Sequence, residues 1–182
     1  MPLYEFPKTI TIDGDKELTV RPLRKEDEQK LHQYFIELPA EEIARFEEDV
    51  TNPAVVERWM YDLDYDETLP LVAMDDGRIV ANAALRFNEM GWTRHKGQIR
   101  RATVAPAYRE KGLSMALMQE MISIAIKLDL EQITAELSPQ LDEAYFMCEK
   151  MGFKEAAVLK NFIKDQEGNY EDLVIMIKDL LN

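Results

Sequence analysis

The chain has 182 residues, of which 46% are hydrophobic, and a formal net charge of -13 at pH 7. This length suits one substantial hydrophobic core, so we expect a single domain over residues 1–182. The negative charge argues against general nucleic-acid binding, because phosphate groups require a basic surface.

Cysteine and histidine are scarce. The single cysteine, Cys148, excludes an internal disulfide, and the two distant histidines, His32 and His95, do not suggest a zinc site, so we expect no metal. The segment 1–14 lacks the order of a signal peptide, and no apolar run reaches membrane length. We therefore expect a cytoplasmic protein with no membrane partner.

Charge is unevenly distributed along the chain. Residues 94–111 contain six Lys or Arg and one acid, whereas residues 41–67 contain ten acids and two Arg. A cationic segment in an acidic protein suggests a local anion site. A solvated face of mixed charge explains the same counts.

Alternating apolar residues predict strands, most of them in hairpins. The turn sequences Asp13-Gly14 and Asp76-Gly77 mark the first two hairpins. The three predicted hairpins cover residues 8–22, 69–87 and 153–177, and two further strands cover residues 98–104 and 131–137.

Apolar residues three and four positions apart predict helices. The predicted helices cover residues 26–38, 41–48, a segment that starts at Pro53, 111–128 and 141–151. We expect Thr51 or Asn52 to cap the third of these, and Trp59 within it to lie in the core. The helix 111–128 has so broad an apolar face that we expect it to be pressed against a sheet.

The order of the elements indicates the fold class. Strand 98–104, helix 111–128 and strand 131–137 form a strand-helix-strand unit, which implies a parallel pair in an otherwise antiparallel sheet. We expect an α/β fold of the mixed α+β kind. Its central sheet should have about seven strands, flanked by four to five helices.

The junction between strand 98–104 and helix 111–128 contains cationic and small residues that a turn alone does not require. Gly112 and Ser114 are small enough to admit an anion to the backbone N–H groups at the helix start, with the positive end of the helix dipole behind them. Arg109 and Lys111 would add positive charge. The segment is neither GxxxxGK[ST] nor GxGxxG, which disfavours a nucleoside triphosphatase and a Rossmann dehydrogenase.

The segment Arg109-Glu110-Lys111-Gly112-Leu113-Ser114 follows the pattern Arg/Gln-x-x-Gly-x-Gly/Ala, with serine as the small last residue. It resembles the acyl-CoA pyrophosphate loop of the GNAT superfamily of acyl-CoA-dependent N-acyltransferases. Three further segments are similar to that family and occur in its order: Val20-Arg21-Pro22-Leu23 with Asp27, Val104-Ala105-Pro106 with Tyr108, and Cys148-Glu149-Lys150-Met151-Gly152-Phe153. The resemblance spans residues 18–180 and implies a GNAT-like sheet.

The resemblance also implies a site. The acyl group should lie between strands 98–104 and 131–137, with a backbone N–H near Val104 polarising the thioester carbonyl. Acetyl-CoA is the implied cosubstrate and a primary amine the implied acceptor, and the sequence is compatible with a homodimer. The residues expected to bind CoA are Ala102, Thr103, Val104, Arg109, Glu110, Lys111, Gly112, Leu113 and Ser114.

Proton transfer is less clearly marked. An amine with a pKa near 10.4 is only about 0.04% neutral at pH 7, so its attack needs a base. Gln98 stands where relatives often carry a useful Glu, which makes Glu136 the expected base and Glu89 a weaker candidate. A structural role for Glu136, with ordered water as the proton acceptor, is the alternative.

Cys148 stands where many family members carry a tyrosine that protonates the departing CoA thiolate. A thiol with a pKa near 8.5 can leave as the thiolate, so a missing acid does not abolish catalysis. Cysteine is a small, frequently buried residue, and we expect Cys148 in the core.

The favoured hypothesis is an enzyme that transfers acetyl from acetyl-CoA to an amine by direct attack. The segment 18–46 also looks like the acyltransferase module of bacterial protein-lysine acetylases, so a protein lysine is one candidate acceptor, beside an N-terminus, an amino acid, a polyamine or an antibiotic amine. The acids of residues 41–67 would attract such a cation or form a solvated face. The rival hypotheses are a catalytically silent acyl-CoA-binding regulator, suggested by Gln98 and Cys148, and a scaffold with no nucleotide site.

Overall fold

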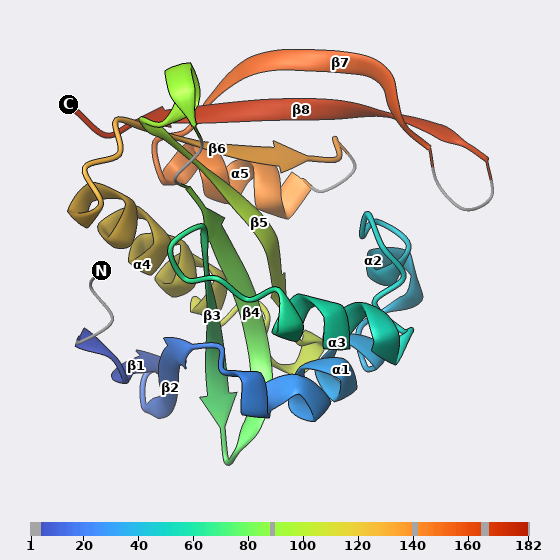
Figure 1. The fold of residues 1–182 in the computed structure, drawn as a ribbon, viewed down its shortest axis with the longest axis vertical. Helices are drawn as coiled ribbons and strands as arrows, with labels where there is room; N and C mark the ends of the chain where they lie inside the picture. Colours follow the sequence, from blue (N-terminus) through green and yellow to red (C-terminus); the bar gives the residue numbers. More distant parts are fainter. Residues whose placement is uncertain (1–4, 88–89, 140–141, 165–167, 182) are drawn as a thin grey trace.

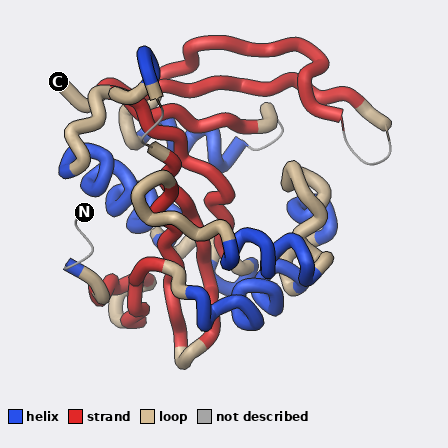
Figure 2. Tube along the Cα trace, viewed as in Figure 1, coloured by secondary structure: helices blue, strands red, loops and turns tan. Residues whose placement is uncertain are grey.

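A computed structural model of the chain describes residues 5–87, 90–139, 142–164 and 168–181. These residues form one eight-stranded sheet in the order β1-β2-β3-β4-β5-β6-β8-β7, with helices on both faces (Figures 1 and 2). The strands are β1 (Lys8–Ile12), β2 (Lys16–Pro22), β3 (Thr68–Asp75), β4 (Arg78–Arg86), β5 (Lys96–Val104), β6 (Gln132–Leu137), β7 (Lys154–Lys164) and β8 (Tyr170–Asp179). The α-helices are α1 (Glu28–Ile36), α2 (Ala40–Ile43), α3 (Pro53–Tyr61), α4 (Leu113–Lys127) and α5 (Asp142–Lys150).

The sheet is antiparallel except between β5 and β6, which confirms the predicted mixed fold with one parallel pair. The parallel register begins at Lys96 with Gln132 and ends at Ile99 with Ala135, although β5 continues to Val104. The ends of β5 and β6 therefore separate, and the backbone of β5 beyond Ile99 is not paired with β6.

Both faces of the sheet are buried, which explains why β3 is almost continuously apolar. Leu71 and Ala73 belong to the core cluster that contains α4, whereas Val72 and Met74 belong to the cluster that contains α1 and α3. Successive side chains of a strand point to opposite faces, so the two clusters lie on the two sides of the sheet. The broad apolar face of α4 is buried as predicted.

The third helix begins as the sequence predicts. The side chain of Asn52 accepts a hydrogen bond from the Ala54 N–H at 3.0 Å, and Pro53 occupies the first turn of α3. The predicted helix 41–48 is wrong in length, because α2 ends at Ile43. Beyond it the chain turns so that Phe46 packs edge-on against Phe35, with 5.3 Å between ring centroids, and this tertiary contact overrides helix propensity.

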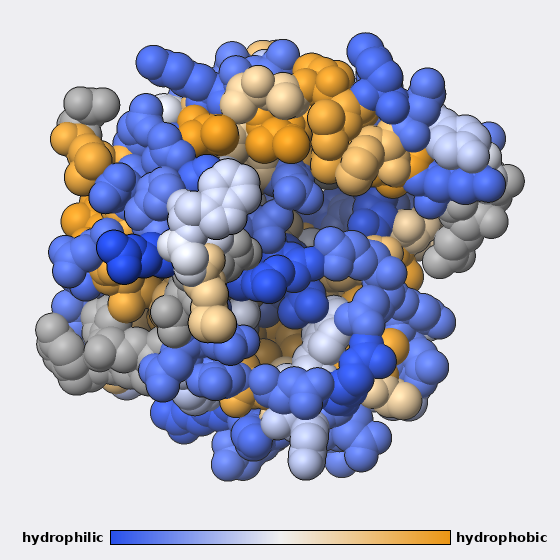
Figure 3. All heavy atoms as spheres, turned by 45° about the horizontal axis from the view of Figure 1, so that its top comes forward, coloured by the Kyte–Doolittle hydropathy of each residue, from blue (hydrophilic) through white to orange (hydrophobic). Residues whose placement is uncertain are grey.

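The strands β7 and β8 close one edge of the sheet. Phe162 on β7 is 64% exposed, and hydrophobic side chains gather over this part of the molecule in Figure 3. In the described residues, no helix is long and apolar enough to span a membrane.

A buried ion pair fixes the passage from β2 into α1. Two guanidinium nitrogens of Arg21 donate to the two carboxylate oxygens of Asp27 at 2.6 and 2.7 Å, and the Arg24 N–H donates to the same carboxylate at 2.9 Å. Burial favours the neutral form of Asp27, but the hydrogen bonds from Arg21 and Arg24 outweigh it and lower the pKa of this carboxyl. This pair gives a physical reason for the Arg21…Asp27 pattern in the sequence.

We expect Asp27→Asn to lower the free energy of unfolding by about 3 kcal/mol at pH 7, because it leaves the Arg21 guanidinium without its counter-charge. A lowered folded-state pKa means that the pair stabilises the fold above the unfolded pKa of about 3.9, and that this contribution disappears as the pH falls through the lower folded value. The free energy of unfolding, measured with urea, should therefore decrease less below pH 4 for the variant than for the parent. Glu37→Gln is the matched control, since its partner Arg78 is exposed, and an Asp27→Asn effect no larger than the control would contradict this role.

Candidate active site

The loop before α4 presents backbone N–H groups to open space. Gly112 is the N-cap of α4, with φ 83° and ψ 0°, and has no side chain with which to cap the helix. A Cβ built on Gly112 would meet no atom within 4 Å. The first helical hydrogen bond runs from the Ala116 N–H to the Gly112 carbonyl at 3.0 Å, so the preceding N–H groups have no partner within the helix.

The residues around Gly112 anchor and complete this loop. Leu113 is buried under α4, Ser114 and Lys111 are exposed, and Glu110 adopts a left-handed φ of 59°. Two left-handed residues close together turn successive N–H groups toward one side, which is the geometry of an anion-binding nest. The loop thus has the shape and polarity expected for a pyrophosphate.

At the end of β5, backbone groups that are not paired with β6 face the gap between the two strands. The Ala105 N–H donates to the Val80 carbonyl of the hairpin next to β5 at 2.9 Å. Because successive N–H groups of a strand point to opposite sides, the Val104 N–H points away from β4 and toward the gap. Ala102 is exposed, while Thr103 pairs with Asn82 and accepts a hydrogen bond from the Tyr34 hydroxyl at 2.9 Å.

A β-bulge interrupts the pairing of β4 with β5. Asn82 pairs with Thr103 and Ala84 with Arg100, so Arg101 and Ala102 together face a single residue of β4. Arg101 has a left-handed φ of 55°, and its carbonyl accepts a hydrogen bond at 3.0 Å from the buried Asn82 amide. The bulge bends β5 near the point where it leaves β6.

Arg109 is turned back toward the protein. Its Nε donates to the Val104 carbonyl at 3.0 Å, and its Nη2 lies 2.5 Å from Glu42 Oε1 without the alignment of a hydrogen bond. The charge of Arg109 is therefore offset by Glu42. Lys111 lies 3.9 Å from Asp13 in an exposed contact, which is worth little in water.

Glu136 lies one residue beyond Ala135, the last residue of β6 that pairs with β5, at the start of the gap. It is exposed, and its Oε1 accepts a hydrogen bond from Gln98 Nε2 at 2.8 Å. Gln98 pairs with Thr134, so Glu136, two residues further on, lies on the same face. The structure therefore brings Gln98 and Glu136 together, whereas Glu89 lies outside the described residues.

Cys148 is 1% exposed and belongs to the core beneath α5, as expected. Burial raises the pKa of its thiol to about 11. A neutral, enclosed thiol is poorly placed to exchange protons with a departing group. The described residues contain no cluster of three or more His, Cys, Asp or Glu side chains arranged for a metal ion.

Several acids of the segment 41–67 are paired with other groups of the same chain. Glu42 contacts Arg109, as described above, and Glu47 accepts from Arg100 at 2.5 Å. Glu48 accepts from Arg58 and, at 2.6 Å, from the Trp59 indole N–H. Glu42 and Glu47 therefore join the acidic segment to the cationic segment 94–111, whereas the partners of Glu48 belong to the acidic segment itself.

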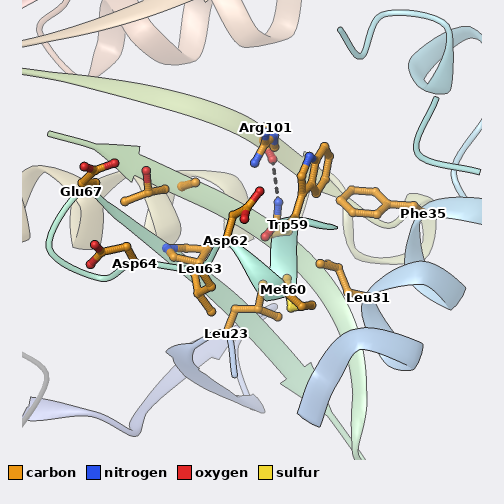
Figure 4. Close-up of a pocket in the computed structure, with 14 residues that line it drawn as sticks. Leu23, Leu31, Phe35, Trp59, Met60, Asp62, Leu63, Asp64, Glu67 and Arg101 are labelled. Carbon is orange, nitrogen blue, oxygen red and sulfur yellow. Dashed lines mark hydrogen bonds between the residues drawn. The ribbon is translucent and has the colours of Figure 1, made fainter. Parts of the chain in front are cut away.

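A pocket of about 180 Å³ opens on the face of the sheet that carries α1 and α3 (Figure 4). Its apolar walls come mainly from α1, α3 and β3. Asp64 and Glu67 lie on the side away from Trp59, and Asp62 lies near Trp59 (Figure 4). Trp59, expected in the core, lies at its edge, half-buried beneath the Arg101 guanidinium. The lining residues are Leu23, Leu31, Phe35, Trp59, Met60, Asp62, Leu63, Asp64, Glu67, Thr68, Pro70, Asn82, Ala84 and Arg101.

Comparison with known proteins agrees with this geometry. The family model described as "Acetyltransferase (GNAT) family" matches residues 29–153. An acetyltransferase of Pseudomonas aeruginosa is 28% identical over 154 residues, covering 79% of this chain and 78% of the relative.

Solved structures share the fold. The ribosomal-protein-S5-alanine acetyltransferase of Vibrio fischeri superposes with a TM-score of 0.79 at 16% identity, covering 95% of this chain and 98% of that one. A GNAT-family acetyltransferase of Streptococcus pneumoniae gives 0.77 at 18% identity, covering 89% and 99%. With the family model matching more than half of its length, the chain belongs to the acetyltransferase (GNAT) family.

Proposed function

We propose that this member of the family transfers an acetyl group from acetyl-CoA to a primary amine by direct attack. The observation that carries the proposal is the occurrence of two features on consecutive segments: uncapped N–H groups at the start of α4, and the gap in which β5 leaves β6. The first suits a pyrophosphate and the second suits an extended pantetheine arm ending in a thioester. Residues 102–104 and 109–114 would hold the cosubstrate, mainly through backbone groups, since Arg109 is paired with Glu42.

We expect the chain's own groups to carry out the transfer. The Val104 N–H would polarise the thioester carbonyl, as an oxyanion donor does. The ammonium form of the acceptor first loses a proton to Glu136, directly or through water, and the neutral nitrogen then forms the new C–N bond. The C–S bond breaks, and the second proton of the nitrogen passes to solvent. The CoA sulfur leaves as the thiolate and takes a proton from solvent, because the buried Cys148 thiol is not placed to supply one.

Release of CoA thiol in the presence of acetyl-CoA and a panel of amines tests this function. We expect saturable, amine-dependent release, together with acetyl-CoA binding by calorimetry. The panel should include small amines, amino acids and lysine-containing peptides, since the acceptor decides whether turnover is seen.

The buried Cys148 and the uncharged Gln98 favour one rival, a catalytically silent acyl-CoA-binding regulator. Both functions require acetyl-CoA binding, so calorimetry does not separate them. Tight binding with no thiol release above the rate without amine, for every acceptor, would establish the rival. Absence of binding at millimolar acetyl-CoA would reject both.

A further inference from the structure

Arg101 lines the pocket of Figure 4, where Glu47 and Glu48 favour its charge from beyond ion-pair distance. Its guanidinium carbon lies 3.7 Å from the centroid of the Trp59 ring, a stacked cation–π contact. Within the described part of the chain its guanidinium forms no ion pair and no hydrogen bond. Burial, with the neighbouring Arg100 adding repulsion, lowers the pKa of Arg101 to about 10.

Two of the nearby carboxylates are already engaged, whereas Asp62, which also lines the pocket, lies near Trp59 in Figure 4. Glu47 is bonded to Arg100, and Glu48 is bonded to Arg58 and to the Trp59 indole. The hydrogen bond from the Trp59 indole N–H to Glu48 holds in place the ring over which the Arg101 guanidinium is stacked. The guanidinium is therefore held over the ring, and its N–H groups, from which no described protein group accepts, are open to solvent and to an incoming anion.

The size and lining of the pocket limit the kind of molecule that can carry this anionic group. About 180 Å³ holds roughly six waters at about 30 Å³ each, the size of a small acceptor molecule. Leu23, Met60 and Leu63 give it an apolar wall. The carboxylates of Asp64 and Glu67 lie on the side away from Trp59 in Figure 4 and would repel a second negative group.

We infer that Arg101 binds the carboxylate of an amino-acid-type acceptor, whose side chain is neutral or basic and lies against the apolar wall. The inference rests on the proposed transfer to an amine and narrows its acceptor. A guanidinium fork receives a carboxylate through two parallel hydrogen bonds, which a simple amine does not form. Strand β5 carries both Arg101 and Val104. An acceptor bound by Arg101 would therefore lie beside the strand whose end is proposed to hold the thioester.

Trp59 offers a direct reading of binding that needs no turnover. Trp92 is the other tryptophan of the chain and is 89% exposed, so Trp92→Phe leaves Trp59 as the sole tryptophan, whose emission is excited selectively over that of the tyrosines. In this background, leucine and lysine are titrated against their decarboxylated counterparts, isopentylamine and cadaverine, with CoA present. We expect saturable changes in emission for the amino acids and a Kd about tenfold to a hundredfold weaker for the amines.

Arg101→Gln should remove this preference by weakening the amino acids alone, and Arg101→Lys should keep part of it, since charge remains but the planar fork is lost. Arg94→Gln is the control, because Arg94 is an exposed cation of the same segment. Equal binding of acids and amines by the parent, or equal loss of both in Arg101→Gln, would overturn the inference. If glutamate bound with the same affinity as leucine, the proposed repulsion of a second negative group by Asp64 and Glu67 would be wrong.

Thiol release with acetyl-CoA on the same ligands separates this inference from the proposed function. If isopentylamine were acetylated as efficiently as leucine, the proposed acetyltransferase activity would be supported and the role of Arg101 in binding a carboxylate would be rejected. Arg101-dependent binding of leucine and lysine, with no acetylation of any amine, would support the carboxylate site and reject the transferase.

Discussion

Gly112→Val should weaken acetyl-CoA binding by about a hundredfold or more. The Gly112 backbone is left-handed, and the space that a Cβ would enter is open. In the proposed complex the pyrophosphate fills that space, so a branched side chain would both block the anion and shift the N–H groups that receive it. Calorimetry with acetyl-CoA gives the Kd, and thermal unfolding reports whether the fold is kept.

The chain supplies a control with the same backbone cost. Gly77, in the turn between β3 and β4, has φ 80° and is equally open around a Cβ. Gly77→Val therefore suffers a similar strain of about 1–2 kcal/mol without touching the loop before α4. Equal affinities for the two variants would remove the assignment of Gly112 to the pyrophosphate site, whatever their stabilities.

Local signals predicted the elements of this fold well. Asp13-Gly14 and Asp76-Gly77 both adopt left-handed φ angles, in a three-residue turn between Ile12 and Lys16 and a two-residue turn between Asp75 and Arg78, and both hairpins form where expected. The pattern of a strand, a helix and a strand was enough to place the parallel pair. Such features depend on neighbouring residues, which a sequence displays directly.

The features that complete the site depend on contacts between distant segments. Arg109 looks in the sequence like a cation for phosphate, but Glu42, from a segment far away in the chain, lies against it. Arg101 adopts a left-handed backbone that glycine or asparagine would have signalled, and the bulge follows from its pairing with β4. Trp59 lay on an apolar helix face, and nothing local indicated that Arg101 would cover its ring.

Glu136→Gln should lower kcat/KM at pH 7 by about a hundredfold, the lower range for loss of a general base, while leaving the Kd of acetyl-CoA unchanged. Glutamine is nearly isosteric and can still meet the Gln98 amide, which now donates to Glu136 Oε1 at 2.8 Å. The variant therefore removes the proton acceptor and little else. The measurement is kcat/KM over a range of pH for the parent and the variant with one amine.

The pH dependence distinguishes a base from a structural residue. An amine of pKa near 10.4 is about 0.04% neutral at pH 7 and about 4% neutral at pH 9, so a base matters less as the pH rises. The ratio of parent to variant rates should fall across this range if Glu136 takes the proton. Glu131→Gln is the control, because Glu131 is exposed just before β6. A constant ratio, or a Glu131→Gln variant equally impaired, would assign the proton to ordered water and leave Glu136 a partner of Gln98 alone.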